Sequence, residues 1–387
     1  MSEVAEVVPK IVKFIFKDVP DPFENFNIVI KPLENSRSFW SECYQILVTP
    51  KSEKYSDKII SPLFVKIPRI SAVNLACDPD NAEENTKILI ALTEDFKNAE
   101  FPGFPIPRFY YGESLENEEM AGLVCEDFSG IGASIDFVPG FNDSQTLQLM
   151  SALAQFHAKT IKDGIPLEKY NNDLYDAAWM RMLYNDTLDF ETLCPEKLSG
   201  RIQAVKHAFD DDSVQNSDNL NSKRNMPFVI CHNDLNTSNV LWNKTTGNVF
   251  FIYSRYSKIQ FFQIQAFIDF QHISKGAVTF DIIRIFCLGL SVKDRKENTE
   301  RYLHKYYDVF QNQFSSDSIP FTFEQLLQSY SDHFNFVNAT SLFSLSYYYK
   351  MYKDTTLDPE DDPKEKEEKA EEILRRAIGI LDDIQSI

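Results

Sequence analysis

The stretch that decides the fold spans residues 228–242 and reads FVICHNDLNTSNVLW. The apolar runs at its two ends, FVI and VLW, are typical of short strands, and a polar loop joins them. In that loop His232, Asp234 and Asn239 form the pattern H-x-D-x-x-x-x-N. For a chain with 6 His, 31 Asp and 25 Asn, about 0.03 accidental matches are expected, so the loop is a specific signal.

A second carboxylate follows further along the chain, where the apolar run AFI ends at Asp269. Phosphoryl transfer needs a loop Asp that orients an acceptor hydroxyl and takes its proton, and it needs oxygen ligands for Mg²⁺. We therefore expect Asp234 to be the catalytic or acceptor-orienting group. Asn239 and Asp269 are the expected metal ligands, and His232 is expected to orient the catalytic loop.

A purely structural interpretation of the loop is also open. Asp and Asn side chains often bond the backbone of a tight turn, and Asp234 with Asn239 would then only hold the loop together. The carboxylate of Asp269 at the end of a later strand favours the functional interpretation, because a turn needs no such partner.

Three segments, HNDLNTSNVLW, AFIDFQ and FDIIRIF, resemble the choline-kinase-like (CHK) domain family. That family includes the ecdysteroid-kinase-like proteins and is related to choline kinases and aminoglycoside phosphotransferases. The resemblance implies an α+β, bilobal protein-kinase-like fold with a small β-rich N-lobe and a larger, mainly helical C-lobe. It also implies ATP and Mg²⁺ as cofactors and a small hydroxylated molecule as acceptor. By position, Asp234 matches the family's catalytic Asp, and Asn239 and Asp269 match its metal ligands.

In the smaller lobe, Lys66 in the run FVKI matches the family's strand lysine, which contacts the α- and β-phosphates. Glu83 is then the expected helix partner of Lys66, and the adjacent Glu84 is an alternative. Taken alone, Lys66 reads as a strand lysine that points to water. Because the same chain also carries the motifs around Asp234 and Asp269, the nucleotide-binding role of Lys66 is favoured.

The expected nucleotide loop, residues 34–41, departs from the family because the chain has no glycine before Gly103. Ser36 and Ser38 stand where relatives often have glycine, which lets backbone N–H groups approach the phosphates. Serine is small and its hydroxyl can donate to phosphate, but it lacks the freedom of glycine at positive φ. Asn236, where relatives commonly have Trp, is a second departure on the acceptor side.

Two further motifs are interpreted as structural. Asp281 and Arg284 sit where the family often has Asp-x-x-Arg at the start of a helix. His157 lies on the apolar face of a predicted helix over Asp143–Lys162, and we expect a core histidine that supports the catalytic loop rather than a proton shuttle.

The periodicity of the sequence changes from two to 3.6 near residue 127, so we predict an N-lobe over 1–126 and a C-lobe over 127–387. A C-terminal helix carries an apolar stripe and is expected to dock on the C-lobe. Short strands are predicted at 27–30, 44–48, 62–68, 108–111 and 122–125, and a helix at 80–97. The aromatic segment 249–263 is either an extended hairpin or retained intron sequence, and sequencing of the transcript would separate the two.

The composition limits the partners. The chain has 387 residues with 39 Lys+Arg against 58 Asp+Glu, a formal net charge of −19. Such a surface repels phosphate backbones and anionic lipid heads, so we expect neither nucleic acid nor a membrane as partner. The six cysteines lack the spacing of a zinc site, and the N-terminal sequence is not that of a secretory signal, so we expect a cytoplasmic protein.

These observations favour an ATP- and Mg²⁺-dependent kinase that phosphorylates a small-molecule hydroxyl. Choline or ethanolamine, a sterol and a foreign hydroxylated compound all remain open as acceptors. The glycine-free loop keeps an alternative open, a catalytically weak pseudokinase that binds nucleotide or a metabolite as an interaction module. A third hypothesis, an acidic scaffold with no nucleotide site, leaves the combination of Lys66, Asp234 and Asp269 unexplained.

Overall fold

The computed structural model describes residues 4–33, 41–58, 62–68, 103–113, 122–170, 177–210, 219–244, 263–270, 272–354 and 362–385. The chain divides into two structural units. The first comprises Met1–Glu100, Pro105–Ala133 and Gln265–Gln271, and the second comprises Phe101–Phe104, Ser134–Ile264 and His272–Ile387. The predicted helix at 80–97 and residues 249–262 of the aromatic segment lie outside the described residues. The predicted lobe boundary after residue 126 stays a prediction.

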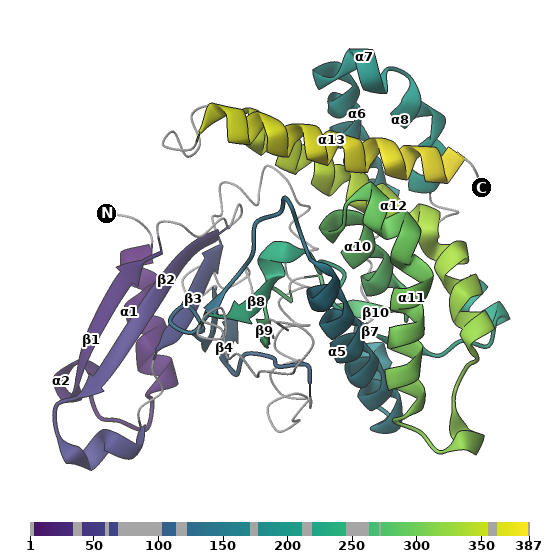
Figure 1. Ribbon diagram of the computed structural model, residues 1–387. Coiled ribbons are helices and arrows are strands. Elements are labelled where there is room, and N and C mark those ends of the chain that lie inside the picture. Colours follow the sequence, from purple (N-terminus) through teal and green to yellow (C-terminus); the bar gives the residue numbers. More distant parts are fainter. Residues whose placement is uncertain are drawn as a thin grey trace, which may run out of the picture. The chain divides into compact units, whose positions relative to one another are not determined.

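A five-stranded sheet forms the first unit, in the order β1-β2-β3-β5-β4 (Figure 1). All four pairings are antiparallel, and β3 is the central strand. Lys66 on β3 lies opposite Cys43 of β2 and Leu123 of β5. The strands are β1 (Phe26–Pro32), β2 (Ser41–Pro50), β3 (Leu63–Pro68), β4 (Phe109–Glu113) and β5 (Gly122–Glu126). All five predicted strands are therefore confirmed, with longer bounds in most cases.

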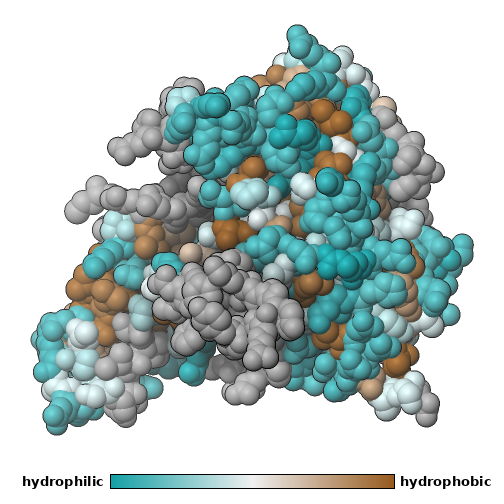
Figure 2. All heavy atoms as spheres, viewed as in Figure 1, coloured by the Kyte–Doolittle hydropathy of each residue, from teal (hydrophilic) through white to brown (hydrophobic). Residues whose placement is uncertain are grey.

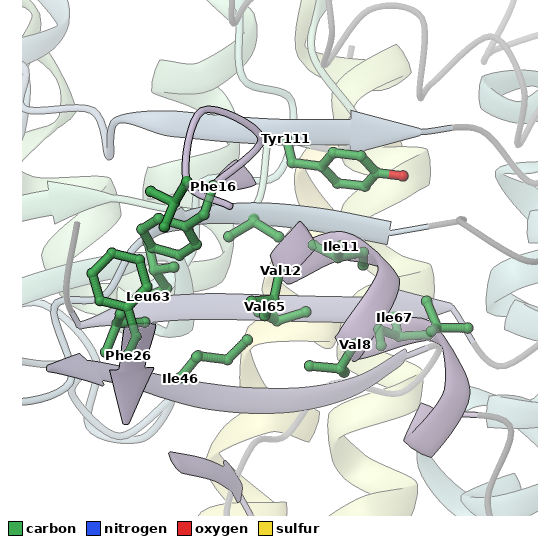
Figure 3. Close-up of a cluster of buried hydrophobic side chains, with 14 of the residues drawn as sticks. Val8, Ile11, Val12, Phe16, Phe26, Ile46, Leu63, Val65, Ile67 and Tyr111 are labelled. Atoms are coloured by element: carbon green, nitrogen blue, oxygen red, sulfur yellow. The ribbon is translucent and has the colours of Figure 1, made fainter. Parts of the chain in front are cut away.

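Helix α1 (Val4–Ile15) packs on one face of this sheet (Figure 3). Its buried residues Val8, Ile11 and Val12 recur at helical spacing and meet the buried side chains of β3, namely Leu63, Val65 and Ile67. Full burial of one such side chain stabilises a fold by roughly 1.5–3 kcal/mol. Because side chains alternate along a strand, burying this set on the α1 side turns Lys66 to the opposite face.

The other elements of the first unit are short. They are α2 (Pro22–Asn25), the 3₁₀ turn η1 (Glu53–Lys58) and β6 (Gly132–Ala133). Strand β9 (Ile264–Phe267) leads directly to Asp269.

The second unit is mainly helical. Its long helices are α5 (Asp143–Lys162), α6 (Ala177–Leu193), α10 (Phe280–Gly289), α11 (Val292–Gln311), α12 (Phe323–Lys353) and α13 (Pro363–Gln385). Shorter elements are α7 (Pro195–Leu198), α8 (Arg201–Ala204), η2 (Leu167–Tyr170), η4 (Lys206–Phe209), η5 (Thr237–Asn239) and η6 (Ser316–Ser318), with strands β7 (Phe228–Cys231), β8 (Val240–Asn243) and β10 (Ser274–Ala277).

Helix α5 occupies the predicted range, Asp143–Lys162, because local signals define both ends. Asn142 and Gln145 form a reciprocal capping box at the N-terminus, and Lys159 and Lys162 lie in the last turn, where they suit the helix dipole. His157 of this helix is fully buried, and its Nδ1 lies 2.8 Å from the Tyr306 hydroxyl. It is a core histidine, as predicted.

The C-terminal helix α13 packs along α12 (Figure 1), so the predicted docking of this helix is confirmed. Its apolar stripe is buried, and so is Arg376, which is 1% exposed. The Arg376 guanidinium donates to the backbone carbonyls of Phe137, Leu288 and Pro139 at 2.6–3.0 Å. A charged side chain at this depth is tolerated because carbonyl oxygens receive its N–H groups.

The surface and the cysteines agree with the composition. On the face shown in Figure 2 the described residues are mostly hydrophilic, and hydrophobic residues lie in patches among them. Of the helices that the structure describes, none has the length and apolar character of a membrane span. Cys43, Cys125, Cys194, Cys231 and Cys287 are free and buried, and Cys77 lies outside the described residues.

Candidate functional site

The backbone of the loop that follows β7, residues 232–239, is held by the buried carboxylate of Asp281 at the start of α10. The two Asp281 oxygens accept the backbone N–H groups of His232 and Asn233, each at 2.8 Å. Burial raises the pKa of Asp281, and the positive potential of His232 and these two N–H groups opposes that rise. Asp281 therefore fixes the direction in which the chain leaves β7, which is the structural role predicted for it.

The side chain of Asn233 ties the loop to the neighbouring strand. Its amide nitrogen donates to the His272 carbonyl at 2.9 Å and to the Ser274 hydroxyl at 2.7 Å. The backbone of Asn233 has φ +60°, a left-handed conformation that Asn tolerates better than most side chains. Next in the chain, the Asp234 N–H donates to His232 Nδ1 at 3.3 Å, and the predicted orienting role of His232 stays a prediction.

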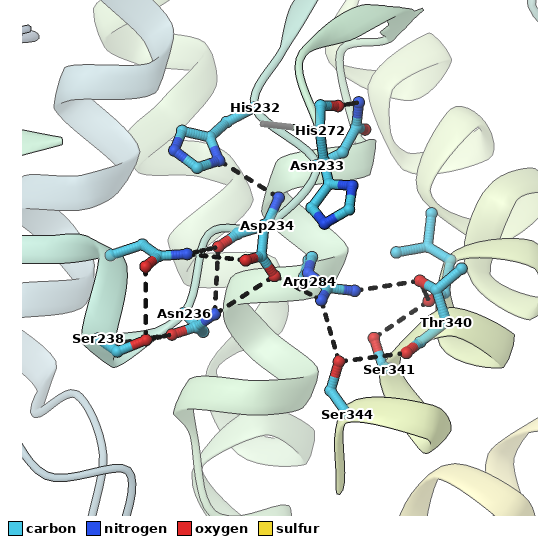
Figure 4. Close-up of polar contacts among 12 residues, drawn as sticks. His232, Asn233, Asp234, Asn236, Ser238, His272, Arg284, Thr340, Ser341 and Ser344 are labelled. Atoms are coloured by element: carbon cyan, nitrogen blue, oxygen red, sulfur yellow. Dashed lines mark hydrogen bonds and ion pairs between the residues drawn. The ribbon is translucent and has the colours of Figure 1, made fainter. Parts of the chain in front are cut away.

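The carboxylate of Asp234 is bonded on both oxygens (Figure 4). Arg284 Nη2 lies 2.7 Å from Oδ1, and Asn239 Nδ2 lies 2.8 Å from Oδ2. Burial raises the pKa of Asp234, but the charge and hydrogen bond of Arg284, together with the nearby His272 and His232, outweigh burial and hold the pKa below its usual range. Asp234 is therefore an ionised and fixed carboxylate at neutral pH.

Asn239 presents its two amide atoms differently. Its Nδ2 donates to both the backbone oxygen and Oδ2 of Asp234, at 2.8 Å each, whereas among the described residues its Oδ1 has one long contact, 3.4 Å from the Ser238 hydroxyl. The donor bonds assign the nitrogen and leave the oxygen with free lone pairs. A carboxamide oxygen is a ligand that Mg²⁺ accepts, so Asn239 fits the predicted metal role.

In the first unit, Lys66 Nζ and Asp269 Oδ1 form an ion pair at 2.7 Å. The side chains are 15% and 29% exposed, so the pair is largely shielded from solvent. Asp269 has φ +64°, and the next residue, Phe270, is buried edge-to-face against Phe109 with ring centres 6.4 Å apart. The structure thus brings together Lys66 and Asp269, two residues that the sequence analysis singled out from separate motifs.

Asp269 in the first unit and Asn239 in the second each carry a side-chain oxygen of the kind that a hard cation such as Mg²⁺ takes as a ligand. Within the described residues, no cluster of three or more His, Cys, Asp or Glu side chains could hold a metal by itself. Ser36, Ser38 and Glu83, with its alternative Glu84, lie outside those residues.

Sequence reasoning did not identify Arg284 as a neighbour of Asp234. Asp281 and Arg284 are three residues apart, which places both on one face of α10. This spacing could have indicated that both side chains contact the same loop, residues 232–239. Asn236 was noted as a departure, and its Nδ2 lies 3.2 Å from the Asp234 carbonyl. Tyr348 was not singled out at all; its hydroxyl lies 3.4 Å from that of Ser238, and its ring stacks on Phe137.

Comparisons with known proteins agree with this architecture. The chain is 65% identical to "Uncharacterized kinase-like protein D1044.1" of Caenorhabditis elegans, over 99% of this chain and 100% of the relative. The crystal structure of choline kinase from Cryptosporidium parvum Iowa II superposes with a TM-score of 0.56 at 10% identity, covering 97% of each chain. This similarity confirms the predicted fold.

A weaker similarity is to the GDP complex of wild-type aminoglycoside 2′-phosphotransferase-IIIa, with a TM-score of 0.43 and 12% identity over 100% of this chain and 99% of the other. The DUF1679 family model, described as "Uncharacterized oxidoreductase dhs-27", matches residues 88–387. Because that match covers most of the sequence, the chain belongs to the DUF1679 family, and its fold is kinase-like.

Proposed function

We propose that the protein is an ATP- and Mg²⁺-dependent phosphotransferase that phosphorylates a hydroxyl of a small molecule. The observation that carries this proposal is the ion pair of Lys66 with Asp269, two side chains 203 residues apart in the sequence that meet at 2.7 Å. The sequence motifs had assigned Lys66 to the phosphates of the nucleotide and Asp269 to the metal ion, each from its own motif. An accidental resemblance would not require these two residues to meet.

In this proposal Lys66 binds the phosphates of ATP, and Asp269 and Asn239 supply oxygen ligands to Mg²⁺. Bound Mg²⁺ would neutralise charge on the phosphates during transfer. Glu83, Ser36 and Ser38 complete the proposed nucleotide contacts. The Lys66–Asp269 pair keeps both side chains ordered before the nucleotide binds, which lowers the entropic cost of binding.

Asp234 is proposed to orient the acceptor hydroxyl and to receive its proton. Within the part of the chain that the structure describes, its Oδ2 accepts one bond, from Asn239, which leaves a lone pair for a hydroxyl donor. A carboxylate with a lowered pKa is a weak base, so its main contribution is to align the hydroxyl, and the proton moves late.

An oxidoreductase, the activity in the family description, is a poorer fit. A dinucleotide-binding fold needs a parallel βαβ unit with the fingerprint G-x-G-x-x-G. Every pairing whose register is given within the described residues is antiparallel, and the sequence has no such glycine pattern. The acceptor class remains a hydroxylated small molecule, such as a choline- or ethanolamine-like, sterol-like or foreign compound.

The absence of glycine before Gly103 favours one second candidate, a pseudokinase that binds nucleotide or a metabolite without efficient turnover. Mg-ATP binding separates the proposals from the scaffold hypothesis. A ligand at 100 times its dissociation constant stabilises a protein by about 2.7 kcal/mol, which a thermal-shift titration detects. We expect this shift in the wild type, its loss in Lys66→Met, and its retention in Lys31→Met, a control at an exposed lysine of β1 in the same sheet. No shift in the wild type would contradict nucleotide binding.

A further inference from the structure

Arg284 of α10 is a buried cation beside the carboxylate of Asp234. Its Nη2 lies 2.7 Å from Asp234 Oδ1, and the two side chains are 9% and 18% exposed. An arginine at this depth requires acceptors for its N–H groups. The ones it has come from the catalytic loop and from α12.

The two α12 acceptors are hydroxyl groups whose own hydrogens are already used. Thr340 donates its hydroxyl hydrogen to the Val337 carbonyl at 2.8 Å and accepts from Arg284 Nη1 at 3.1 Å. Ser344 donates to the Thr340 carbonyl at 3.3 Å and accepts from Arg284 Nη2 at 3.0 Å. Both hydroxyls therefore turn lone pairs toward the guanidinium, which fixes its plane (Figure 4).

Helix α10 thus holds the catalytic loop at two levels. Asp281 binds the backbone of the loop, and Arg284, three residues later on the same face, binds the Asp234 side chain. With Arg284 on Oδ1 and Asn239 on Oδ2, the Asp234 carboxylate cannot rotate without breaking a charge-assisted bond.

Stability alone accounts poorly for this arrangement. The buried Nε of Arg284 has no hydrogen-bond partner among the described residues, which is a cost to the fold. Buried ion pairs are often no more stabilising than apolar side chains of similar volume. Arg284 nevertheless contacts Asp234 and two oriented hydroxyl groups. These contacts are better explained by the orientation that Arg284 gives to the Asp234 carboxylate.

We propose that Arg284 is a positioning residue, held by Thr340 and Ser344, that fixes the Asp234 carboxylate in the orientation needed to align the acceptor hydroxyl. This inference rests on the proposed phosphotransferase function. Arg284 acts through Asp234 and is not required to touch ATP. Its loss should therefore lower kcat and leave nucleotide affinity unchanged.

The test compares kcat and the Mg-ATP dissociation constant for wild type, Arg284→Met and Arg284→Lys, with the acceptor that supports turnover. Misplacement of a reacting group by about 1 Å costs on the order of 100-fold in rate, so we expect about that loss of kcat in Arg284→Met. Arg284→Lys should recover part of kcat, because an ammonium can reach Asp234 but cannot also bind both hydroxyls.

Two further variants keep the test interpretable if Arg284→Met folds poorly. The Thr340→Val, Ser344→Ala double variant keeps Arg284 but removes the two hydroxyl groups that accept its hydrogen bonds. It should lower kcat by a smaller factor than Arg284→Met does. Arg295→Met is the matched control, because Arg295 is also a buried arginine, 2.6 Å from Asp383. It should lower the melting temperature and leave kcat per folded molecule unchanged.

A kcat in Arg284→Met equal to wild type would overturn the inference, as would a weakened Mg-ATP affinity with unchanged kcat. The same holds if Arg295→Met loses as much kcat as Arg284→Met, since any buried arginine would then matter equally. Wild-type protein that neither binds Mg-ATP nor turns over would instead overturn the proposed function, and the positioning role with it.

Discussion

Lys66 Nζ lies 2.7 Å from Asp269 Oδ1, although one residue comes from the central strand of the sheet and the other follows β9, 203 positions later. The two opposite charges form an ion pair that is largely shielded from solvent. Removing either one leaves the other partly buried and without that partner, so substitutions at the two sites should not have independent effects on nucleotide binding.

Asp269→Asn should abolish the Mg²⁺-dependent part of ATP binding, because a neutral amide is a weaker ligand for a hard cation. The expected result is loss of most of the roughly 2.7 kcal/mol of stabilisation at 100 times the wild-type dissociation constant. Thermal-shift titrations with ATP plus Mg²⁺ and with ATP plus EDTA measure it. Asp163→Asn, which breaks an exposed ion pair with Lys159, is the control. Equal Mg²⁺ dependence in Asp269→Asn and wild type would remove Asp269 from the metal site.

Asp281→Ala should destabilise the second unit strongly. It leaves the backbone N–H groups of His232 and Asn233 buried without their acceptor, at a cost of about 1–3 kcal/mol each. Urea unfolding followed by circular dichroism gives the change in free energy. A loss below about 1 kcal/mol would mean that water replaces the carboxylate and that Asp281 does not hold the loop.

His157 should make the protein sensitive to mild acid. Burial lowers the pKa of His157 to about 3, whereas an unfolded histidine titrates near 6.5. The unfolded chain therefore binds a proton that the folded chain excludes, and stability is lost as pH falls from about 6.5 toward 3, by about 1.4 kcal/mol per pH unit.

The partner of His157, the Tyr306 hydroxyl, stays neutral because burial raises its pKa far above the usual value. Unfolding free energies of wild type and His157→Gln at pH 7 and pH 5 test the effect. The variant should lose about 2 kcal/mol less than wild type over this interval. Parallel pH profiles would show that His157 is solvated in the folded protein.

Gly140→Ala should be more destabilising than Gly164→Ala. Both glycines have positive φ, +91° and +59°, so both substitutions carry a backbone cost of about 1–2 kcal/mol. Only at Gly140 would the new Cβ also overlap the Gly289 carbonyl oxygen at the end of α10; no heavy atom lies within 4 Å of a Cβ at Gly164. Chemical denaturation should rank the two variants in this order, and equal costs would show that the segment before α5 moves freely away from α10.

Much of the architecture follows from local sequence signals. Helix α5 was predicted from the helical spacing of its apolar residues, and its observed ends coincide with a capping box at Asn142 and lysines in the last turn. Helix α1 was missed because Pro9 interrupts its pattern, and its stability comes from packing on the sheet rather than from propensity.

In the candidate site, too, some features could be predicted from the sequence and others could not. The roles of Lys66 and Asp269 came from motifs, and their meeting follows from the fold that those motifs indicate. The contact of Arg284 with Asp234 could not be predicted, because helical spacing fixes the face of α10 but not what that face meets. The roles of Glu83, Ser36 and Ser38 stay predictions.

The most direct test of the central claim is a screen of hydroxylated metabolites for ATP-dependent gain of a phosphoryl group, read by mass spectrometry, with wild type and Asp234→Asn side by side. General-base and orienting groups contribute about 10²–10⁴-fold, so turnover should fall by that factor in Asp234→Asn while Mg-ATP binding is kept. Phosphorylated product formed equally by both proteins, or by neither despite bound Mg-ATP, would contradict the account.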